Sequence, residues 1–392
     1  MPPIPTDKIW ARTIEIIKSP ETKKEARKSE EYFSRNRGMS FTENVIFVIN
    51  KGNTSIQTEL NRFFTNHKKE EKSISEQAFS EARQKYNASP FEKLFEMSAE
   101  ESYGEESMLT KMYRGYYLFG IDGTDLVLPQ CPELREKYGE MKGIAAAQGS
   151  ACYDILSERI VTAEIGKITA SERTLAKKHL KKLKKMGLND KSIVIFDRGY
   201  PCAELLRYLS ENGFKYLMRV KRKFNVKIDK IESDKEVELK NGVVVRAVKV
   251  PLNEDFETLI TNLDWTPDEL FELYGKRWGI ETDYNTLKNK IQVEAWSGLT
   301  ETAMLQDFWA SLFLNNLVLI EKFHADTLIA QNRANKNNKY IYKANLNEIV
   351  GSIKHRFIDI CFADNPETVK KTEHHSHRNS KSSYTCQTRQ KG

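Results

Sequence analysis

The spacing of apolar residues changes along this chain and predicts different structures for its successive segments. Up to about residue 110, apolar positions recur at helical spacing, as in SISEQAFSEARQKY, where Ile74, Ala78 and Ala82 share one face. From Tyr116 onward, short apolar runs typical of β-strands begin with YYLFGID. The pattern therefore predicts a helical N-terminal region over 1–110 and a mixed α/β region after it.

The segment 111–200 predicts the first part of an α/β core. GSACYDILSERIVTAEIG is typical of one or two strands, and SIVIF is typical of a buried strand. Between them, Ser171 can cap a helix that runs to Lys185, with leucines on its inner face and Gly187 after its end. The next segment, 201–263, starts with a helix over AELLRYLSEN and then predicts a β-rich insertion.

The insertion is predicted from four strand-like runs, YLMRV, FNVKI, VVVRAVKV and TLITNL. The pair Asn241 and Gly242 between two of these runs is a hairpin signal. Helical patterns follow over 264–330, the end of the core, and over 331–365, a C-terminal helical region. Residues 366–392 have few large apolar side chains and therefore predict a disordered tail.

The strongest helix start in the chain lies at Thr266. The Thr266 side chain can cap the helix, Pro267 is tolerated in the first turn, and Glu269 completes a capping box. The helical pattern then continues to about Lys290. We therefore predict one long helix in this segment.

Four functional side chains fall on one strip of this helix, about 60° wide when each residue turns by about 100°. They are Tyr274, Arg277, Glu281 and Lys288. Glu272 and Asp283 point away from the strip, which distinguishes Glu281 from the neighbouring acids. The same strip also fits an amphipathic helix with solvated charges, because Arg277 and Glu281 are four residues apart and can pair.

Two aspartates end apolar strand-like runs, Asp122 in YYLFGIDGT and Asp197 in SIVIFDRGY. Ligands of α/β sheets lie just beyond the carboxyl ends of strands. Two acids there, joined by a third from a helix, can hold a pair of divalent cations for phosphoryl transfer, and oxygen ligands suit Mg²⁺ with Mn²⁺ as a substitute. Each aspartate also fits a turn or a helix cap. Asp125 is an alternative to Asp122, and we interpret Asp154 as structural.

The composition agrees with a folded protein that has a highly charged surface. Hydrophobic residues make up 39%, charged residues 30%, and the net charge is +7. Basic residues gather at 23–28, 177–185 and 219–223, which fits nucleic-acid binding and also solvated helix faces. Five cysteines without a CxxC pair argue against a disulfide framework and a cysteine-ligated zinc site.

The sequence predicts neither a secreted nor a membrane protein. The N-terminal residues lack the basic and apolar regions of a signal peptide. No stretch approaches the about 20 apolar residues of a membrane span. We therefore expect a soluble, cytoplasmic protein.

Three blocks of this sequence resemble the DDE transposases of bacterial insertion sequences, specifically the insertion-sequence-four family. IDGTDLVLP is similar to the first-aspartate block and places the acid at Asp122 rather than at Asp125. VIFDRGYP is similar to the second block and gives Asp197. The third block is the Y-(2)-R-(3)-E-(6)-K signature, present here as Tyr274, Arg277, Glu281 and Lys288.

The resemblance implies a ribonuclease-H-like catalytic core, with the β-rich insertion between the second aspartate and the glutamate. By this analogy, the catalytic residues that hold Mg²⁺ are Asp122, Asp197 and Glu281. The DNA-binding residues that contact phosphates near the transposon end are Tyr274, Arg277 and Lys288. The implied protein is a bacterial DNA transposase that acts as a homodimer on double-stranded terminal repeats and target DNA. In such a protein we expect the helical region 1–110 to bind DNA. It would be cytoplasmic and associated with the nucleoid when bound to DNA.

Two other functions fit the same residues. A metal-dependent nuclease such as a junction resolvase can share the fold and the acids, but it does not require the tyrosine, arginine and lysine of the third block. A catalytically silent DNA-binding relative would not need Asp122, Asp197 and Glu281 intact.

Overall fold

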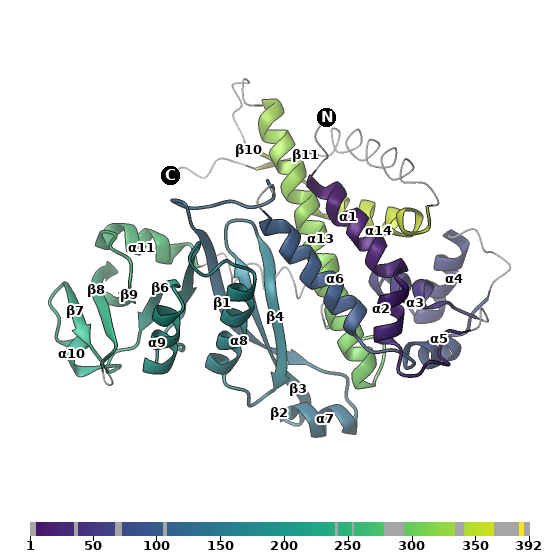
Figure 1. Cartoon of the computed structure of the whole chain (residues 1–392), viewed down its shortest axis with the longest axis horizontal. Helices are drawn as coiled ribbons and strands as arrows, with labels where there is room; N and C mark the ends of the chain where they lie inside the picture. Colours follow the sequence, from purple (N-terminus) through teal and green to yellow (C-terminus); the bar gives the residue numbers. More distant parts are fainter. Residues whose placement is uncertain are drawn as a thin grey trace. The chain divides into compact units, whose positions relative to one another are not determined.

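A computed structural model represents the whole chain, and two compact units are distinguished in it (Figure 1). The described residues are 5–34, 38–66, 73–104, 108–239, 242–252, 255–277, 294–333, 341–363 and 384–387. One unit is Thr110–Lys290, and the other combines Met1–Leu109 with Ile291–Gly392. The second combination joins the two ends of the chain, which the sequence pattern did not predict.

The unit that contains both ends of the chain is mainly helical. Its described elements are α1 (Pro5–Lys18), α2 (Pro20–Ala26), α3 (Phe41–Asn50), α4 (Ile56–Asn66), α5 (Glu76–Arg83), α6 (Ser89–Glu100), the short 3-10 helix η1 (Glu101–Tyr103), α13 (Glu301–Arg333), β10 (Ile341–Ala344), α14 (Leu346–Phe362) and β11 (Tyr384–Gln387). A capping box starts the apolar helix α3, because Ser40 accepts from the backbone N–H of Glu43 and its own N–H donates to the Glu43 carboxylate. α3 and α6 both pack against α13, the longest helix of this unit.

α13 corrects one expectation from the sequence. By length and composition alone it could cross a membrane, although the sequence was expected to contain no stretch of that kind. Polar residues such as Asn315 and Asn316 interrupt its apolar runs. For this reason the sequence predicted a helix in this segment but not one that is apolar enough to cross a membrane. Its most apolar window is 83% buried inside the structure, as in the core helix of a globular unit.

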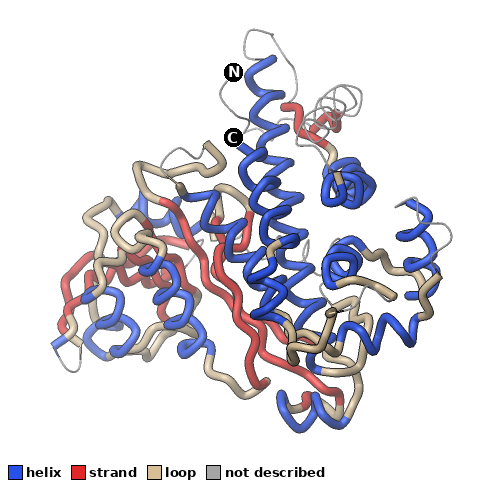
Figure 2. Tube along the Cα trace, turned by 45° about the vertical axis from the view of Figure 1, so that its right-hand side comes forward, coloured by secondary structure: helices blue, strands red, loops and turns tan. Residues whose placement is uncertain are grey.

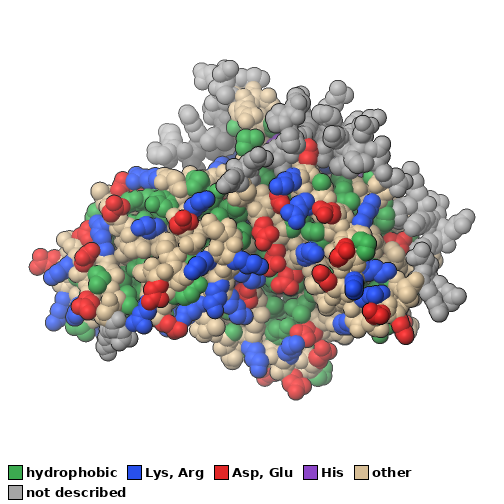
Figure 3. All heavy atoms as spheres, in the orientation of Figure 1, with side chains coloured by type: hydrophobic (Ala, Val, Ile, Leu, Met, Phe, Trp, Pro, Cys, Tyr) green, Lys and Arg blue, Asp and Glu red, His purple; other side chains and the backbone are tan. Residues whose placement is uncertain are grey.

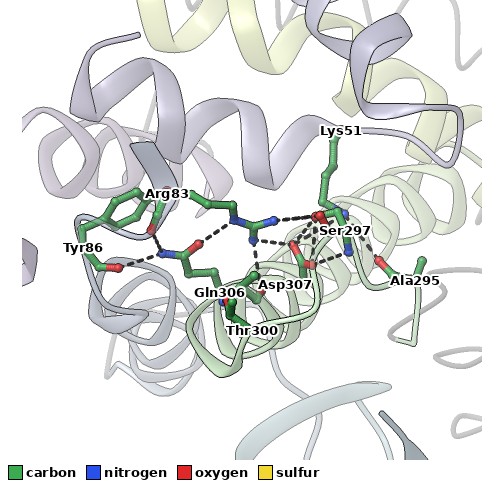
Figure 4. Close-up of polar contacts among 9 residues, drawn as sticks. Lys51, Arg83, Tyr86, Ala295, Ser297, Thr300, Gln306 and Asp307 are labelled. Atoms are coloured by element: carbon green, nitrogen blue, oxygen red, sulfur yellow. Dashed lines mark hydrogen bonds and ion pairs between the residues drawn. The ribbon is translucent and has the colours of Figure 1, made fainter. Parts of the chain in front are cut away.

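A buried ionic network ties α5 and the end of α3 to α13 (Figure 4). The Arg83 guanidinium donates to Gln306 at 2.9 Å, to Asp307 at 3.0 Å and to Ser297 at 2.7 Å. Lys51, directly after α3, lies 3.6 Å from the same Asp307 carboxylate. Burial raises the pKa of Asp307, but Arg83 and Lys51 outweigh this effect and hold the pKa below its ordinary value. The network therefore keeps a buried carboxylate charged.

The unit Thr110–Lys290 is built on a mixed sheet (Figure 2). Its described strands are β1 (Tyr117–Val127), β2 (Glu140–Met141), β3 (Ile144–Asp154), β4 (Arg159–Lys167), β5 (Ser192–Phe196), β6 (Lys215–Val220), β7 (Asp234–Glu238), β8 (Val244–Leu252) and β9 (Asp255–Thr261). The strand order is β2-β3-β1-β5-β6-β9-β8-β7, and β4 pairs with β3. β1, β5 and β6 are parallel to each other, whereas β3 and β9 are antiparallel to their neighbours.

Helices cover both faces of this sheet. α8 (Glu172–Lys185) connects β4 to β5, and α9 (Ala203–Glu211) connects β5 to β6. Because both connections run in the same direction along the sheet and such crossovers are right-handed, the two helices lie on one face, where Lys177 pairs with Glu204. α11 (Pro267–Gly275) packs against β6 and β8 through Leu270 and Leu273. The unit also contains the short helices α7 (Pro132–Tyr138) and α10 (Val226–Asp229).

Several predicted elements have the expected boundaries. α8 follows Ser171 and ends in a Schellman motif, in which the N–H of Leu188 reaches the carbonyl of Leu183 across Gly187, whose φ is +69°. The Ser171 side chain, however, makes no capping hydrogen bond. α11 starts with the predicted capping box of Thr266.

Other elements differ from the predictions. The strand predicted for FNVKI is wrong: these residues form the helical turn α10, because the side chain of Asn225 accepts from the N–H of Lys227 and starts a turn. β7 replaces it as the partner of β8. α11 ends at Gly275, earlier than the predicted end near Lys290, and residues 278–293 lie outside the described residues. Within the tail predicted to be disordered, β11 pairs with β10.

Replacing Asp307 by Asn should destabilise the helical unit. Arg83 and Lys51 would then be left without the carboxylate that compensates their charge. Breaking a buried ion pair in this way costs about 3–5 kcal/mol of unfolding free energy. Urea unfolding followed by circular dichroism measures the loss.

Glu25→Gln is the matched control, because it removes the carboxylate of an exposed pair in the same unit, 3.8 Å from Lys93. Exposed pairs contribute about 0–1 kcal/mol. Equal effects of the two substitutions would show that the buried network does not stabilise this unit more than a surface pair does.

Candidate active site

The parallel pairing of β1 with β5 brings two predicted site residues together. Tyr117 lies opposite Ser192, and the same register holds as far as Gly120 and Ile195. Two more residues in this register set Asp122 opposite Asp197. Adjacent strands are about 4.8 Å apart, and the charge of Asp197 acts on Asp122, so the two carboxylates are close together. Asp197 directly follows β5, as predicted. The prediction that Asp122 ends its strand is wrong, because β1 continues to Val127 in its pairing with β3.

Tyr274 approaches the aspartates from α11. Successive side chains of a strand alternate between the faces of a sheet, so Asp122 is on the same face as Leu118. Leu118 is part of the apolar cluster that includes Leu273 and Tyr274 of α11. The hydroxyl of Tyr274 donates to Asp197 Oδ1 at 3.3 Å. Burial raises the pKa of Tyr274 to about 12, with Arg277 opposing the rise. The hydroxyl of Tyr274 is therefore protonated at neutral pH and can donate a hydrogen bond.

Arg277 supplies the positive charge next to these groups. It is 7% exposed, and its guanidinium carbon lies 5.8 Å from the centroid of the Tyr274 ring. The last turn after α11 is tightened, because the N–H of Arg277 donates to the carbonyl of Tyr274, three residues back. The structure thus brings Asp122, Asp197, Tyr274 and Arg277 into one site.

Asp122 has the most strongly perturbed carboxyl group of the site. Burial raises its pKa to about 6, and the charges of Glu172 and Asp197 add to the rise. The N–H of Gly123, which donates at 2.9 Å, and the charge of Arg277 oppose it. Perturbed carboxylates of this kind concentrate at functional sites.

A chain of buried polar groups fixes the backbone at Asp122. Ser150 of β3 donates to the Asp122 carbonyl at 3.2 Å and contacts His179 Nε2 at 3.0 Å. His179 Nδ1 lies 2.7 Å from the hydroxyl of Thr162 on β4. Burial, together with the charges of Lys182 and Lys178, lowers the pKa of His179 to about 3, so the ring is neutral. α8 is therefore tied to the strand that carries Asp122.

Glu172 is a site neighbour that the sequence interpretation missed. It is the first residue of α8 and lies seven residues before His179, which places both on the inner face of the helix. Leu175, Leu180 and Leu183 continue this face. A carboxylate at the head of an otherwise apolar stripe is the signal that could have identified it.

The other acids discussed from the sequence lie elsewhere. Asp125 is exposed, and as an odd-numbered residue of β1 it lies on the face opposite to that of Asp122. Asp154 is fully buried and accepts from the N–H groups of Leu156 and Ser157, both at 3.0 Å, so it closes the turn after β3. The predicted residues Glu281 and Lys288 lie outside the described residues.

The described part of the site fits a divalent cation but does not form a complete metal centre. Among the described residues, no group of three or more His, Cys, Asp or Glu side chains could hold a metal ion. Asp122 and Asp197 offer two adjacent carboxylates, the hard oxygen ligands that Mg²⁺ and Mn²⁺ prefer. Burial, with the charges of Glu172 and Asp197, raises the pKa of Asp122, so a positive charge there would stabilise the charged carboxylate.

The basic cluster of α8 has partners within its own unit. Lys178 and Lys182 lie 3.3 and 3.1 Å from Glu164, and Lys177 pairs with Glu204. Figure 3 shows Lys and Arg side chains mixed with Asp and Glu over the face that it draws. These contacts favour the solvated helix face for this cluster. DNA binding by the region 1–110 stays a prediction.

Asp122 within β1 and Asp197 just after the adjacent parallel strand β5, inside a mixed α/β sheet, define the chain as an α/β protein with an acidic site on its sheet. The transposase DDE domain family matches residues 113–317, slightly more than half of the chain. The chain therefore belongs to this family. The predicted DDE transposase family is confirmed, whereas the narrower insertion-sequence-four assignment stays a prediction.

Two known proteins are similar to parts or most of this chain. "Putative transposase InsZ" of Escherichia coli (strain K12) is 31% identical over 147 residues, which cover 36% of this chain and 47% of that protein. The match thus spans about half the length of this relative. The cryo-EM structure of a piggyBac transposase synaptic complex with hairpin DNA has a TM-score of 0.53 and 10% identity, with 95% of this chain and 85% of that chain covered. At that identity the likeness concerns the fold.

Asp122→Asn should stabilise the metal-free protein at pH 8. The pKa of Asp122 rises from 3.8 to about 6 on folding, so the charged carboxylate destabilises the fold above pH 6. This cost disappears as the pH falls through 6 towards 4, where the folded protein binds the proton. At about 1.4 kcal/mol per pKa unit, the gain at pH 8 is at most about 3 kcal/mol.

Unfolding in urea with EDTA, at pH 8 and at pH 4.5, measures this dependence. Asp125→Asn is the control, since Asp125 is an exposed acid of the same strand. A variant at Asp122 that is less stable than the original protein at pH 8 would contradict the predicted repulsion.

Proposed function

We propose that this chain is a DNA transposase that cleaves insertion-sequence ends and joins them to target DNA by two-metal-ion phosphoryl transfer. The observation that carries this proposal is the position of Asp122 beside Asp197, within the segment that matches the transposase DDE domain. Asp197 lies just beyond the carboxyl end of β5, the place where α/β sheets bind ligands, and Asp122 lies next to it on β1.

In this proposal, the catalytic core of the enzyme has a ribonuclease-H-like fold. The strands β4-β3-β1 are antiparallel, and β5 and β6 follow in parallel to β1. The β-rich insertion continues the same sheet through β9, β8 and β7. The likeness in fold to the piggyBac transposase supports this assignment.

The proposed metal ligands are Asp122 and Asp197, with Glu281 as the third acid. Bound Mg²⁺, or Mn²⁺ in its place, stabilises both the attacking and the leaving oxygen of a phosphoryl transfer. The hydroxyl of Tyr274 donates a hydrogen bond to Asp197, which orients that carboxylate. Arg277 partly neutralises Asp122 and presents a planar set of donors that suits a phosphate.

The proposed partners are the double-stranded terminal repeats of the element and its target DNA. Arg277 and Lys288 bind phosphates in this proposal, as the Y-R-E-K signature of the insertion-sequence-four family implies. The piggyBac structure, a synaptic complex with hairpin DNA, supports a similar assembly here. We further propose a homodimer that holds two ends together and acts in the bacterial cytoplasm, at the nucleoid when bound to DNA.

Asp122→Asn, Asp197→Asn and Glu281→Gln should each abolish cleavage of a DNA duplex that carries the flanking repeats of the source locus. Loss of a ligand should lower the rate at least about a hundredfold, since even partners outside the ligand set change activity 10- to 100-fold. Binding of the uncut duplex should change little, because these acids hold cations rather than DNA. Gel analysis of cleavage in Mg²⁺ and fluorescence anisotropy of binding measure the two properties.

Asp125→Asn serves as the control and should cleave normally. Equal loss of cleavage and of binding in the three variants would contradict the assigned role. A strand-transfer reaction with pre-cut ends separates the alternatives, because a resolvase yields no joined product and a silent relative yields neither cut nor joined DNA.

Lys288→Ala should weaken binding of the terminal repeat and reduce its salt dependence. Each phosphate contact contributes about 0.9 to the slope of log K against log salt concentration, so the slope should fall by about 1. Titrations at several KCl concentrations measure it. Lys191→Ala is the control, because this exposed lysine precedes β5, at the end of the strand away from Asp197. An unchanged slope in Lys288→Ala would remove this residue from the phosphate contacts.

A further inference from the structure

Glu172 reaches the acidic site from the face of the sheet that α8 covers. A Cβ atom on Gly123, next to Asp122 in β1, would lie 3.0 Å from Glu172 Oε1. A Cβ atom on Gly199, two residues after Asp197, would lie 3.7 Å from Glu172 Oε2. The carboxylate therefore lies between the two segments that carry the aspartates.

Two sets of contacts fix the first turn of α8 in this place. Arg173 donates to the carbonyl of Gly199 at 3.2 and 3.0 Å, which ties the helix start to the loop after β5. Two turns later, the neutral ring of His179 contacts Ser150, which donates to the carbonyl of Asp122. The start of α8, which carries Glu172, is thus held both to the loop after β5 and, through Ser150, to β1.

Among the described residues, no basic side chain pairs with the Glu172 carboxylate. Within this part of the chain it makes no hydrogen bond and no ion pair, although most basic residues of α8 have acidic or amide partners. Glu172 is in the first turn of α8, where the helix dipole favours an acid, and its carboxylate lies next to Gly123 and Gly199.

We propose that Glu172 lies just outside the direct ligands of the cation site that includes Asp122 and Asp197, and that its charge increases the affinity of this site for divalent cations. This inference rests on the proposed metal-dependent function. Mg²⁺ and Mn²⁺ sites keep several water molecules and use few direct carboxylates. A carboxylate just outside the direct ligands holds these waters and adds negative charge.

Binding of Mn²⁺ to the full-length protein, stripped of metal with EDTA, tests the proposal by titration calorimetry. Glu172→Gln keeps the size of the side chain and removes its charge. It should weaken Mn²⁺ binding about tenfold or more, as losses of groups around metal ligands do. In DNA cleavage, it should raise the Mg²⁺ concentration required for half-maximal rate and leave the rate at saturating Mg²⁺ much closer to the original.

Two variants make the result decisive. Glu204→Gln removes an acid from the first turn of the neighbouring helix α9 and should bind Mn²⁺ as the original protein does. Asp122→Asn should lose binding. If Asp122→Asn loses binding and Glu172→Gln does not, the role of Glu172 is wrong and the proposed function stands. If the unmodified chain does not bind Mn²⁺, the proposed metal-dependent function fails as well.

Discussion

The parallel register between β1 and β5 is the constraint on which the acidic site depends. Because the offset between paired residues is constant from Tyr117 to Gly120, Asp122 and Asp197 reach the same level along these two strands. A slip of one residue would turn Asp122 to the other face, away from Tyr274 of α11. Helices on both faces bury these strands and so prevent such a slip.

The same closeness that forms the site has an energetic cost. Burial and the charges of Glu172 and Asp197 raise the pKa of Asp122, and Arg277 compensates only part of this effect. A bound cation would stabilise this buried carboxylate, so the instability of the metal-free site and its affinity for metal have one origin. The buried carboxylate of Asp307 differs from that of Asp122, because Arg83 and Lys51 of the protein itself compensate its charge.

Local signals allowed much of the fold and part of the site to be predicted. A short apolar run predicted β5, and capping residues predicted α8 and the start of α11, because each of these signals depends on neighbouring residues. The strand predicted for FNVKI was wrong because its strand-like composition does not reveal the hydrogen bond of the Asn225 side chain, which starts a helical turn. The pairing of Arg83 with Asp307 joins residues 224 positions apart, which no local pattern encodes. Glu281 and Lys288 lie outside the described residues and stay predictions.

The glycine in the IDGT block links this local motif to a distant helix. A Cβ atom at position 123 would lie 2.7 Å from Gln148 Nε2 and 3.0 Å from the Glu172 carboxylate. Gln148 is buried and donates to the carbonyl of Gly149, so it has little freedom to move away. The side chain at position 123 would then displace Glu172 first, because that carboxylate is exposed. The lack of a side chain next to Asp122 thus permits a second carboxylate to approach from the opposite face of the sheet.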